Sequence, residues 1–249
     1  MGALAARHEG RGLSLVEALR AVMLDPGLSQ FDRAEVGRLL LLVRGERPLD
    51  DLLELFFSQS EKDPLYLTAL TLETLGDQRA IGPLIEALED ENPHRRHAAA
   101  RALGWITPST RRAALALARC LADREQAQPA REEAAESLAY VGTRETIDAL
   151  IGVLGDTDVR IRFWAVFGLG QSCRGEPRAA LALEGMLDDY EEPPGNWWPV
   201  RLEALSALVG ISGVKERHAA VARAEVKRIA GDAEATDGEK RWAEGHTWV

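Results

Sequence analysis

Arg96-His97-Ala98-Ala99-Ala100-Arg101-Ala102-Leu103-Gly104 is the stretch that decides the fold, because its pattern recurs along the chain. In this pattern an arginine is followed by small residues and then by a Leu-Gly-like ending. Further copies begin at Arg131, Arg162 and Arg201, and a degenerate copy begins at Thr68. The copies begin 28 to 39 residues apart, which is typical of stacked helix pairs. The pattern predicts an all-α fold, a right-handed α-solenoid of antiparallel helix pairs that bury their apolar faces against their neighbours.

Proline and glycine mark where the helices begin and end. Pro64, Pro93 and Pro177 stand where proline is favoured at a first helical position. No segment shows the sustained two-residue alternation of a strand, so we predict no sheet. The predicted pairs are 49–58 with 64–75, 78–89 with 93–106, 109–122 with 129–141, 144–154 with 158–171, and 177–189 with 199–211.

These helices divide the chain into four predicted segments. They are N-terminal capping helices near 15–24 and 33–44 within 1–48, the repeat array at 49–213, a C-terminal capping helix at 214–230, and a loosely structured tail at 231–249. Two tryptophans in the tail, Trp242 and Trp248, either fold back onto the last helix, bind a partner or lie exposed.

The composition indicates an acidic protein, and we expect no cofactor. The 249 residues include 30 Lys and Arg against 40 Asp and Glu, a net charge of −10. This balance opposes tight binding to a phosphate backbone and favours a basic partner. Cys120 and Cys173 imply no disulfide framework. Because we find neither a signal peptide nor an apolar run of membrane-spanning length, we expect a cytoplasmic protein.

The second helices at 95–106 and 161–170 resemble HEAT-like repeats of the phycobilisome (bilin) lyase type, which read roughly Val-Arg-x-x-Ala-Ala-x-Ala-Leu-Gly-x-Ile-Gly. The preceding helices at 80–88 and 146–154 match as well. The resemblance covers about 49–213, although the first copy lacks the arginine and the last pair carries an insertion. It implies a solenoid whose second helices line a concave surface. Its members include adaptors, inhibitors, chaperone-like proteins and tetrapyrrole lyase subunits.

A helical wheel gives the side chains expected on that concave surface. Copy by copy they are Tyr66, Ala69 and Glu73; His94, His97 and Arg101; Glu132, Glu133 and Glu136; Arg160, Phe163, Trp164 and Phe167; and Trp198, Leu202, Glu203 and Ser206. The aromatic residues Phe163, Trp164 and Phe167 occupy positions that the repeat does not need for its own core. We predict an exposed binding surface there. The alternative is that a loop, the C-terminal tail or a tighter superhelix covers them.

The connection at 188–199 is longer than the other connections and mixes acidic and aromatic residues with prolines. It contains Tyr190, Trp197 and Trp198, which are residue types that anchor interfaces. We predict that this loop and the aromatic stripe form one partner-binding site. The alternative is that the two tryptophans plug the end of the core.

Two further sets of residues are interpreted without a chemical role. His94 and His97 share a helix face, but no third ligand or metal-binding motif accompanies them, so we predict a basic stripe and no metal site. The recurring arginines are predicted to be structural, reaching acidic groups or helix C-terminal carbonyls between repeats; they are Arg96, Arg131, Arg162 and Arg201.

No catalytic motif is found, so we predict a non-catalytic protein–protein interaction module. It would serve as an adaptor, a regulatory subunit or an immunity-type inhibitor of a protein partner. One alternative is a tetrapyrrole lyase-like or chaperone-like subunit. Another is a HEAT-like DNA glycosylase, which the acidic groove residues disfavour. The sequence leaves the partner and the oligomeric state open.

Overall fold

The computed structural model describes residues 15–23, 25, 27–29, 32–33, 35–36, 49–106, 110–141, 143–172, 176–195, 197–211 and 215–247. Throughout these ranges the regular structure is helical and no strand occurs, which confirms the predicted all-α fold of stacked helix pairs. Most of the predicted helix at 33–44, together with Cys173 and Trp248, lies outside the described residues. The chain divides into two compact units, 1–107 and 108–249.

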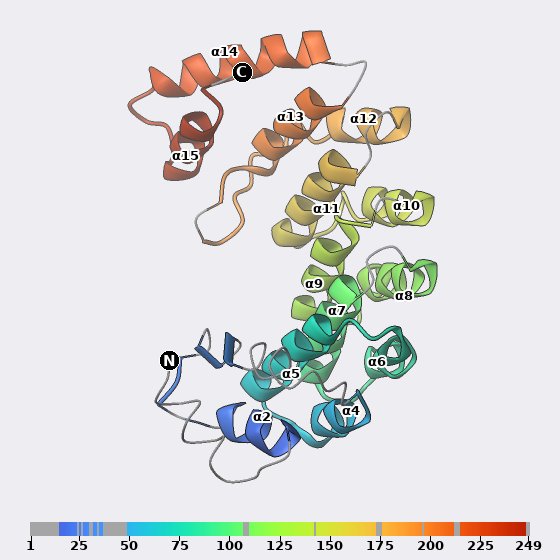
Figure 1. Ribbon diagram of the computed structural model, residues 1–249. Coiled ribbons are helices and arrows are strands. Elements are labelled where there is room, and N and C mark those ends of the chain that lie inside the picture. The colour runs from blue at the N-terminus through green and yellow to red at the C-terminus, as the bar shows by residue number, and fades with distance from the viewer. Residues whose placement is uncertain are drawn as a thin grey trace. The chain divides into compact units, whose positions relative to one another are not determined.

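The first unit contains two antiparallel helix pairs preceded by one more helix (Figure 1). Helix α5 packs against both α4 and α7, and α6 packs against α7. Alanines at 98–100 of α7 are fully buried, and their small side chains let α5 approach closely. The helices are α2 (Leu15–Met23), α4 (Leu49–Ser58), α5 (Lys62–Leu75), α6 (Ile81–Ala87) and α7 (Pro93–Ile106), with a short 3-10 helix at Gln78–Ala80.

The second unit continues the pattern with four further pairs. Its first helices α8, α10 and α12 form one row, and its second helices α9, α11 and α13 form another (Figure 1). Helices α14 and α15 pack together, and α14 packs on α13. The helices are α8 (Arg111–Ala122), α9 (Gln128–Leu138), α10 (Arg144–Gly152), α11 (Val159–Ser172), α12 (Pro177–Glu184), α13 (Val200–Gly210), α14 (Lys215–Ala230) and α15 (Asp237–Gly245).

The recurring arginines of the second unit tie each helix pair to the next, as predicted. Arg131 donates to the carbonyl of Leu121 and to the carboxylate of Asp156 in the following pair. Burial alone would raise the pKa of Asp156, but the hydrogen bonds from Arg131 and from the Asp158 backbone hold it below its ordinary value. These buried contacts fix the spacing between neighbouring pairs.

The other recurring arginines make similar contacts. Arg162 donates to the carbonyl of Asp156 and to the carboxylates of Asp189 and Glu191. Arg96, in the first unit, donates to two turn carbonyls of its own pair, at 90 and 91. Both kinds of predicted acceptor, carbonyl and carboxylate, are therefore used.

The C-terminal segment is ordered, and the prediction of a loose tail at 231–249 is wrong for its described part. Thr236 and Glu239 form a capping box that starts α15. Trp242 is fully buried and packs with Leu202 and Leu205 of α13 and with residues of α14. Of the alternatives for this tryptophan, folding back onto the preceding helices is the one observed.

The described part of the chain contains no membrane-spanning helix. Each helix in the described ranges is too short or too polar to cross a membrane.

Candidate functional site

The long loop and the aromatic stripe of the second unit meet in one cluster of rings. The ring centroids of Trp164 and Trp197 lie 5.7 Å apart, and those of Trp164 and Phe167 lie 5.4 Å apart. Tyr140, at the end of α9, lies 6.1 Å from Phe167. We call this set the aromatic cluster; its members are Tyr140, Phe163, Trp164, Phe167, Trp197 and Trp198.

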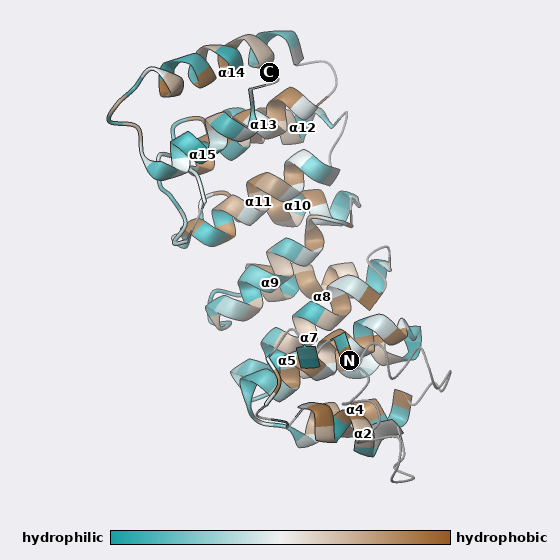
Figure 2. Ribbon diagram, turned by 60° about the vertical axis from the view of Figure 1, so that its left-hand side comes forward, coloured by the Kyte–Doolittle hydropathy of each residue, from teal (hydrophilic) through white to brown (hydrophobic). Residues whose placement is uncertain are grey.

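The cluster borders a row of acidic residues on the adjacent helix α9. Arg160 at the start of α11 lies 3.4 Å from the carboxylate of Glu132, while Phe167 lies beside Tyr140. Glu136 lies one turn after Glu132 on α9 and is half-buried. Helix α9 is mainly hydrophilic and α11 mainly hydrophobic (Figure 2). Glu132 thus places one carboxylate beside the start of the helix that carries the rings.

The prediction that Phe163 lies on the exposed surface is wrong. Its side chain is only 2% exposed, because Trp197 from the loop packs on it at a centroid distance of 4.9 Å. Trp164 and Phe167 remain half-buried, and Trp197 is 37% exposed. The loop therefore covers one predicted ring and replaces it on the surface with one of its own.

Several other residues assigned to the inner surface are also buried. Ala69, Glu133, Leu202 and Glu203 are all in the interior of their units. The helical wheel placed them correctly on the second helices but did not include the elements that pack over them. Tyr190 of the loop is 67% exposed, and the Arg201 guanidinium lies 4.6 Å from its ring centroid.

The long loop is held at both ends. The backbone N–H groups of Val200 and Arg201 donate to the carbonyls of Glu191 and Asp189, closing the loop on itself. Gly195 has a φ of +113°, a conformation that residues with a Cβ adopt rarely, and it turns the chain toward Trp197. Arg162 of α11 binds the carboxylates of Asp189 and Glu191. These contacts give Trp197 a defined position beside α11.

Helix α15 clamps the same loop from the other side. Arg241 donates to the carbonyl of Trp197 at 2.9 Å, and the Thr236 hydroxyl donates to the carboxylate of Glu192. A Cβ at Gly238 would lie 2.5 Å from the Trp197 carbonyl oxygen, so this close approach requires glycine. The C-terminal segment is thus part of the frame that positions the aromatic cluster.

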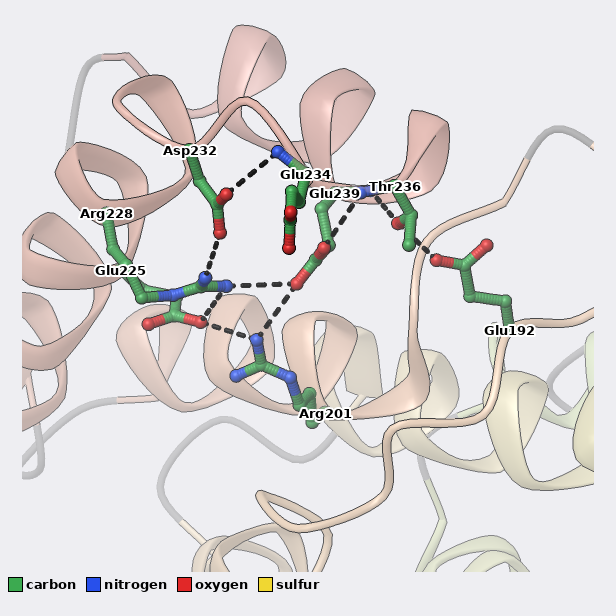
Figure 3. Close-up of polar contacts among 8 residues, drawn as sticks. All are labelled: Glu192, Arg201, Glu225, Arg228, Asp232, Glu234, Thr236 and Glu239. Carbon is green, nitrogen blue, oxygen red and sulfur yellow. Dashed lines mark hydrogen bonds and ion pairs between the residues drawn. The ribbon is translucent and has the colours of Figure 1, made fainter.

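An ionic network fixes α14 and α15 on α13 (Figure 3). Arg201 and Arg228 both donate to the carboxylates of Glu225 and Glu239. For both carboxyls, burial acts to raise the pKa, but hydrogen bonds outweigh it and lower the pKa below the usual range. Arg201 thus extends the series of arginine–carboxylate links into the last helix pair.

A buried acid lies beneath Trp198. The indole N–H of Trp198 donates to Glu203 Oε2 at 2.9 Å. Burial raises the pKa of Glu203 to about 7, although the hydrogen bond from Trp198 acts in the opposite direction. Glu203 joins the loop to α13, a contact that the sequence pattern gave no means of finding.

Ser206 of α13 and His246 form a second hydrogen-bonded contact that the sequence pattern did not predict. The Ser206 hydroxyl lies 3.0 Å from His246 Nε2 and also accepts the indole N–H of Trp242. The His246 ring stacks on Trp242, with centroids 4.7 Å apart. Since Trp242 and His246 belong to the C-terminal segment, these bonds attach that segment to α13.

The predicted residues of the first unit form a separate group. Arg101 lies 3.6 Å from the carboxylate of Glu73, and its guanidinium is 5.9 Å from the ring centroid of Tyr66. The ring centroids of His97 and Tyr66 lie 6.2 Å apart, while His94 is exposed at the start of α7. In the part of the chain that the structure describes, no three His, Cys, Asp or Glu side chains are arranged to hold a metal ion.

An open pocket of about 480 Å³ lies beside the cluster in the second unit. It is lined by Gln128, Thr157, Asp158, Val159, Arg160 and Pro194. Asp158 caps α11 by accepting the backbone N–H of Arg160, so the positive end of this helix is already neutralised.

The fold and its arginine-linked pairs define a helical repeat protein. The chain belongs to the HEAT repeats family, whose model matches residues 49–128 and 121–208. No curated protein sequence matches the chain.

Two solved structures are similar to the chain. A crystal structure of an engineered protein matches with a TM-score of 0.54 at 17% identity, over 97% of this chain and 69% of that one. The complex of CpcE and CpcF of phycocyanin lyase from Nostoc sp. PCC7120 matches with a TM-score of 0.49 at 20% identity, over 94% of this chain and 96% of that one. At 17% identity the similarity to the engineered protein concerns the fold alone.

Proposed function

We propose that this protein is a non-catalytic protein-interaction module that binds a protein partner through the aromatic cluster of its second unit. Adaptors, regulatory subunits and inhibitors all work in this way. The proposal rests on one observation, that four rings form a contiguous and partly exposed surface. They are Tyr140, Trp164, Phe167 and Trp197.

The exposure of these rings supports binding. Tyr140 is 47% exposed and Trp197 is 37% exposed, although both carry apolar area that a core could bury. A contiguous apolar patch on a soluble protein commonly marks an interaction site. Tryptophan and tyrosine are also the residue types that contribute most binding energy at interfaces.

The rigidity of the surroundings supports the same function. Trp164 and Phe167 project from a helix that packs against α9 and α13, and Trp197 is held by the loop contacts described above. Rings that are already positioned lose little conformational entropy when a partner binds.

The test is capture of a partner from native lysate by the wild type and by Trp164→Ser/Phe167→Ser. Phe163 is left intact because its ring is buried, and circular dichroism checks that the variant is folded. We expect the wild type to retain a partner that the variant loses.

The matched control is Leu115→Ser/Leu181→Ser. These leucines are 38% and 72% exposed and lie on the row of first helices. We expect this control to capture the partner as the wild type does. Equal retention by Trp164→Ser/Phe167→Ser and the wild type would refute the aromatic cluster as the binding surface.

A further inference from the structure

The carboxyl group of Glu203 lies in the interior of the second unit, beneath the long loop. Glu203 is 8% exposed, and Trp198 of the loop donates its indole N–H to Oε2 at 2.9 Å. Trp198 also packs on a hydrophobic cluster that includes Leu202 and Trp242. Since α15 clamps the same loop through Arg241, we call residues 190–199 and 236–246 together the cover. The cover separates this acid from water.

Charged side chains on the elements around α13 engage partners other than Glu203. Burial raises the pKa of Glu203 and the Trp198 indole lowers it, and these are the two influences that act on it among the described residues. The other contacts are Arg160 with Glu132, Arg162 with Asp189 and Glu191, Glu184 with Arg217 and His218, Arg201 and Arg228 with Glu225 and Glu239, and Arg241 with the Trp197 carbonyl.

The hydrogen bonds of His246, the titratable group beside Trp198, are compatible with both of its protonation states. Its Nδ1 lies 2.8 Å from the Trp242 carbonyl oxygen, which can only accept, so Nδ1 carries a hydrogen. Nε2 lies 3.0 Å from the Ser206 hydroxyl. This hydroxyl can donate to a neutral ring, or accept from a charged ring while it donates to the Leu202 carbonyl at 2.9 Å. Glu203 is therefore the group whose titration disturbs the packing.

Ionisation of Glu203 places a charge in the interior that one indole N–H cannot solvate. The carboxyl belongs to α13, which is packed against α11, α12 and α14, whereas the described residues of 190–199 contain no helix. Two bonds that clamp this loop to α15 are exposed to water, from Thr236 to Glu192 and from Arg241 to the Trp197 carbonyl. Lifting the cover therefore requires less rearrangement than moving α13.

We propose that Glu203 is a proton-sensitive switch, whose protonated carboxyl keeps the cover closed on α13 and whose ionisation releases it. The inference does not depend on the proposed function, although release would also move Trp197 of the aromatic cluster. Burial determines its direction. Because the pKa of Glu203 is about 7 under the cover against 4.5 ordinarily, closure is fully favoured below the ordinary pKa, and this preference is lost as the pH rises through about 7.

Amide hydrogen exchange of the purified full chain measures the opening at pH 5 and pH 8, after correction for the intrinsic rate at each pH. The amides of Val200 and Arg201, bonded to loop carbonyls, report on the loop, and that of Lys240, bonded to the Thr236 carbonyl, reports on α15. We expect their opening equilibrium constants to rise at least about tenfold from pH 5 to pH 8. Amides of α8 should stay better protected at both pH values, because the array remains folded.

Three variants identify the group responsible. Glu203→Gln keeps an acceptor for Trp198 but cannot ionise, so its opening should change less than about twofold between the two pH values. Glu203→Met, without that acceptor, should also lose the pH dependence. Ser206→Ala removes the bonds to His246 and Trp242, and should raise the opening of α15 by about fivefold at both pH values while keeping the wild-type ratio. Circular dichroism verifies that each variant is folded.

Four outcomes overturn the inference. The wild type opens equally at pH 5 and pH 8, the two Glu203 variants keep the wild-type pH dependence, the loop opens while α15 stays closed, or α8 loses protection to the same extent as the loop. A rise confined to the cover and absent from both Glu203 variants supports it. The lysate capture decides the proposed function separately.

Discussion

Phe163 and Trp164 are adjacent on α11 but have different surroundings. Phe163 is enclosed by Trp197 and Trp198, whereas Trp164 is half-buried. Phe163→Ala should lower the free energy of unfolding by about 3 to 4 kcal/mol because it leaves a cavity, and Trp164→Ala by about 1 kcal/mol. Urea denaturation at equilibrium measures both values. Equal losses would contradict the assignment of Phe163 to the core and Trp164 to the surface.

Glu203 should make stability depend on pH near neutrality. Its pKa is about 7 in the folded protein against 4.5 ordinarily, so the folded state keeps the proton over a range where the unfolded state releases it. The stabilisation is complete below the ordinary pKa and is lost as the pH rises through about 7. We expect the free energy of unfolding to fall by up to about 3 kcal/mol between about pH 5 and pH 8.

Glu203→Gln is the matched variant for this prediction. Glutamine keeps an oxygen acceptor for the Trp198 indole but cannot ionise. Thermal unfolding should show the variant more stable than the wild type at pH 8 and close to it at pH 5. An unchanged pH profile in the variant would assign the dependence to another group.

The chemistry of individual residues was only partly predictable. The wheel identified Trp164 and Phe167 because the repeat leaves their positions free, and both remain partly exposed. It misplaced Phe163 and Glu203, because both are contacted by the long loop. Trp197, more than 30 residues further along the chain, packs on Phe163, and Trp198 donates to Glu203. A wheel considers one helix at a time and cannot include such cover.

At the level of elements, α15 and the long loop support each other. Gly238→Ala would place a methyl group 2.5 Å from the Trp197 carbonyl oxygen, so the helix or the loop must move. We expect the free energy of unfolding to fall by about 1 to 3 kcal/mol, with a shift in tryptophan emission. Chemical denaturation followed by fluorescence measures both.

Gly245→Ala provides the control on the same helix. A Cβ at Gly245 meets no atom within 4 Å, so the substitution should be neutral or slightly stabilising, by up to about 1 kcal/mol. If the two alanine variants lose equal stability, the close contact between α15 and the loop is not the cause.

The helices of the array were predictable, whereas α15 was not. Pro93 marks the start of α7, and the recurring small residues indicate the register of both α7 and α11. Thr236 and Glu239 have the spacing of a capping box, but few apolar residues follow them. The helix is stabilised mainly by burying Trp242 against α13 and α14, a tertiary contact that local sequence does not reveal.

Across the whole molecule, buried arginine–carboxylate pairs link successive repeats of the second unit. The side chains of Arg131 and Asp156 are 8% and 3% exposed. Arg131→Met should lower the free energy of unfolding by about 3 to 5 kcal/mol, because it leaves the Asp156 carboxylate buried without its cation. Urea denaturation, with Asp156→Asn and the double variant completing a cycle, measures the coupling.

The exposed pair of Arg178 and Asp148 is the comparison for this cycle. Both side chains are about half exposed, at 52% and 50%. Breaking this pair should change the free energy of unfolding by less than about 1 kcal/mol, since water screens it. Similar coupling energies in the two cycles would mean that burial does not strengthen the link between repeats.

The arginine links also limit how such an array can change its length by duplication or deletion. Each of these links joins an arginine of one helix pair to an acid of the next pair: Arg131 to Asp156, Arg162 to Asp189, and Arg201 to Glu225. Excising the pair that contains α10 and α11 would bring Arg131 beside the loop that now binds Arg162, where Asp189 and Glu191 could receive it. Excising α12 and α13 would likewise place Arg162 beside α14, where Glu225 could receive it, so the links can re-form only when a whole helix pair is removed.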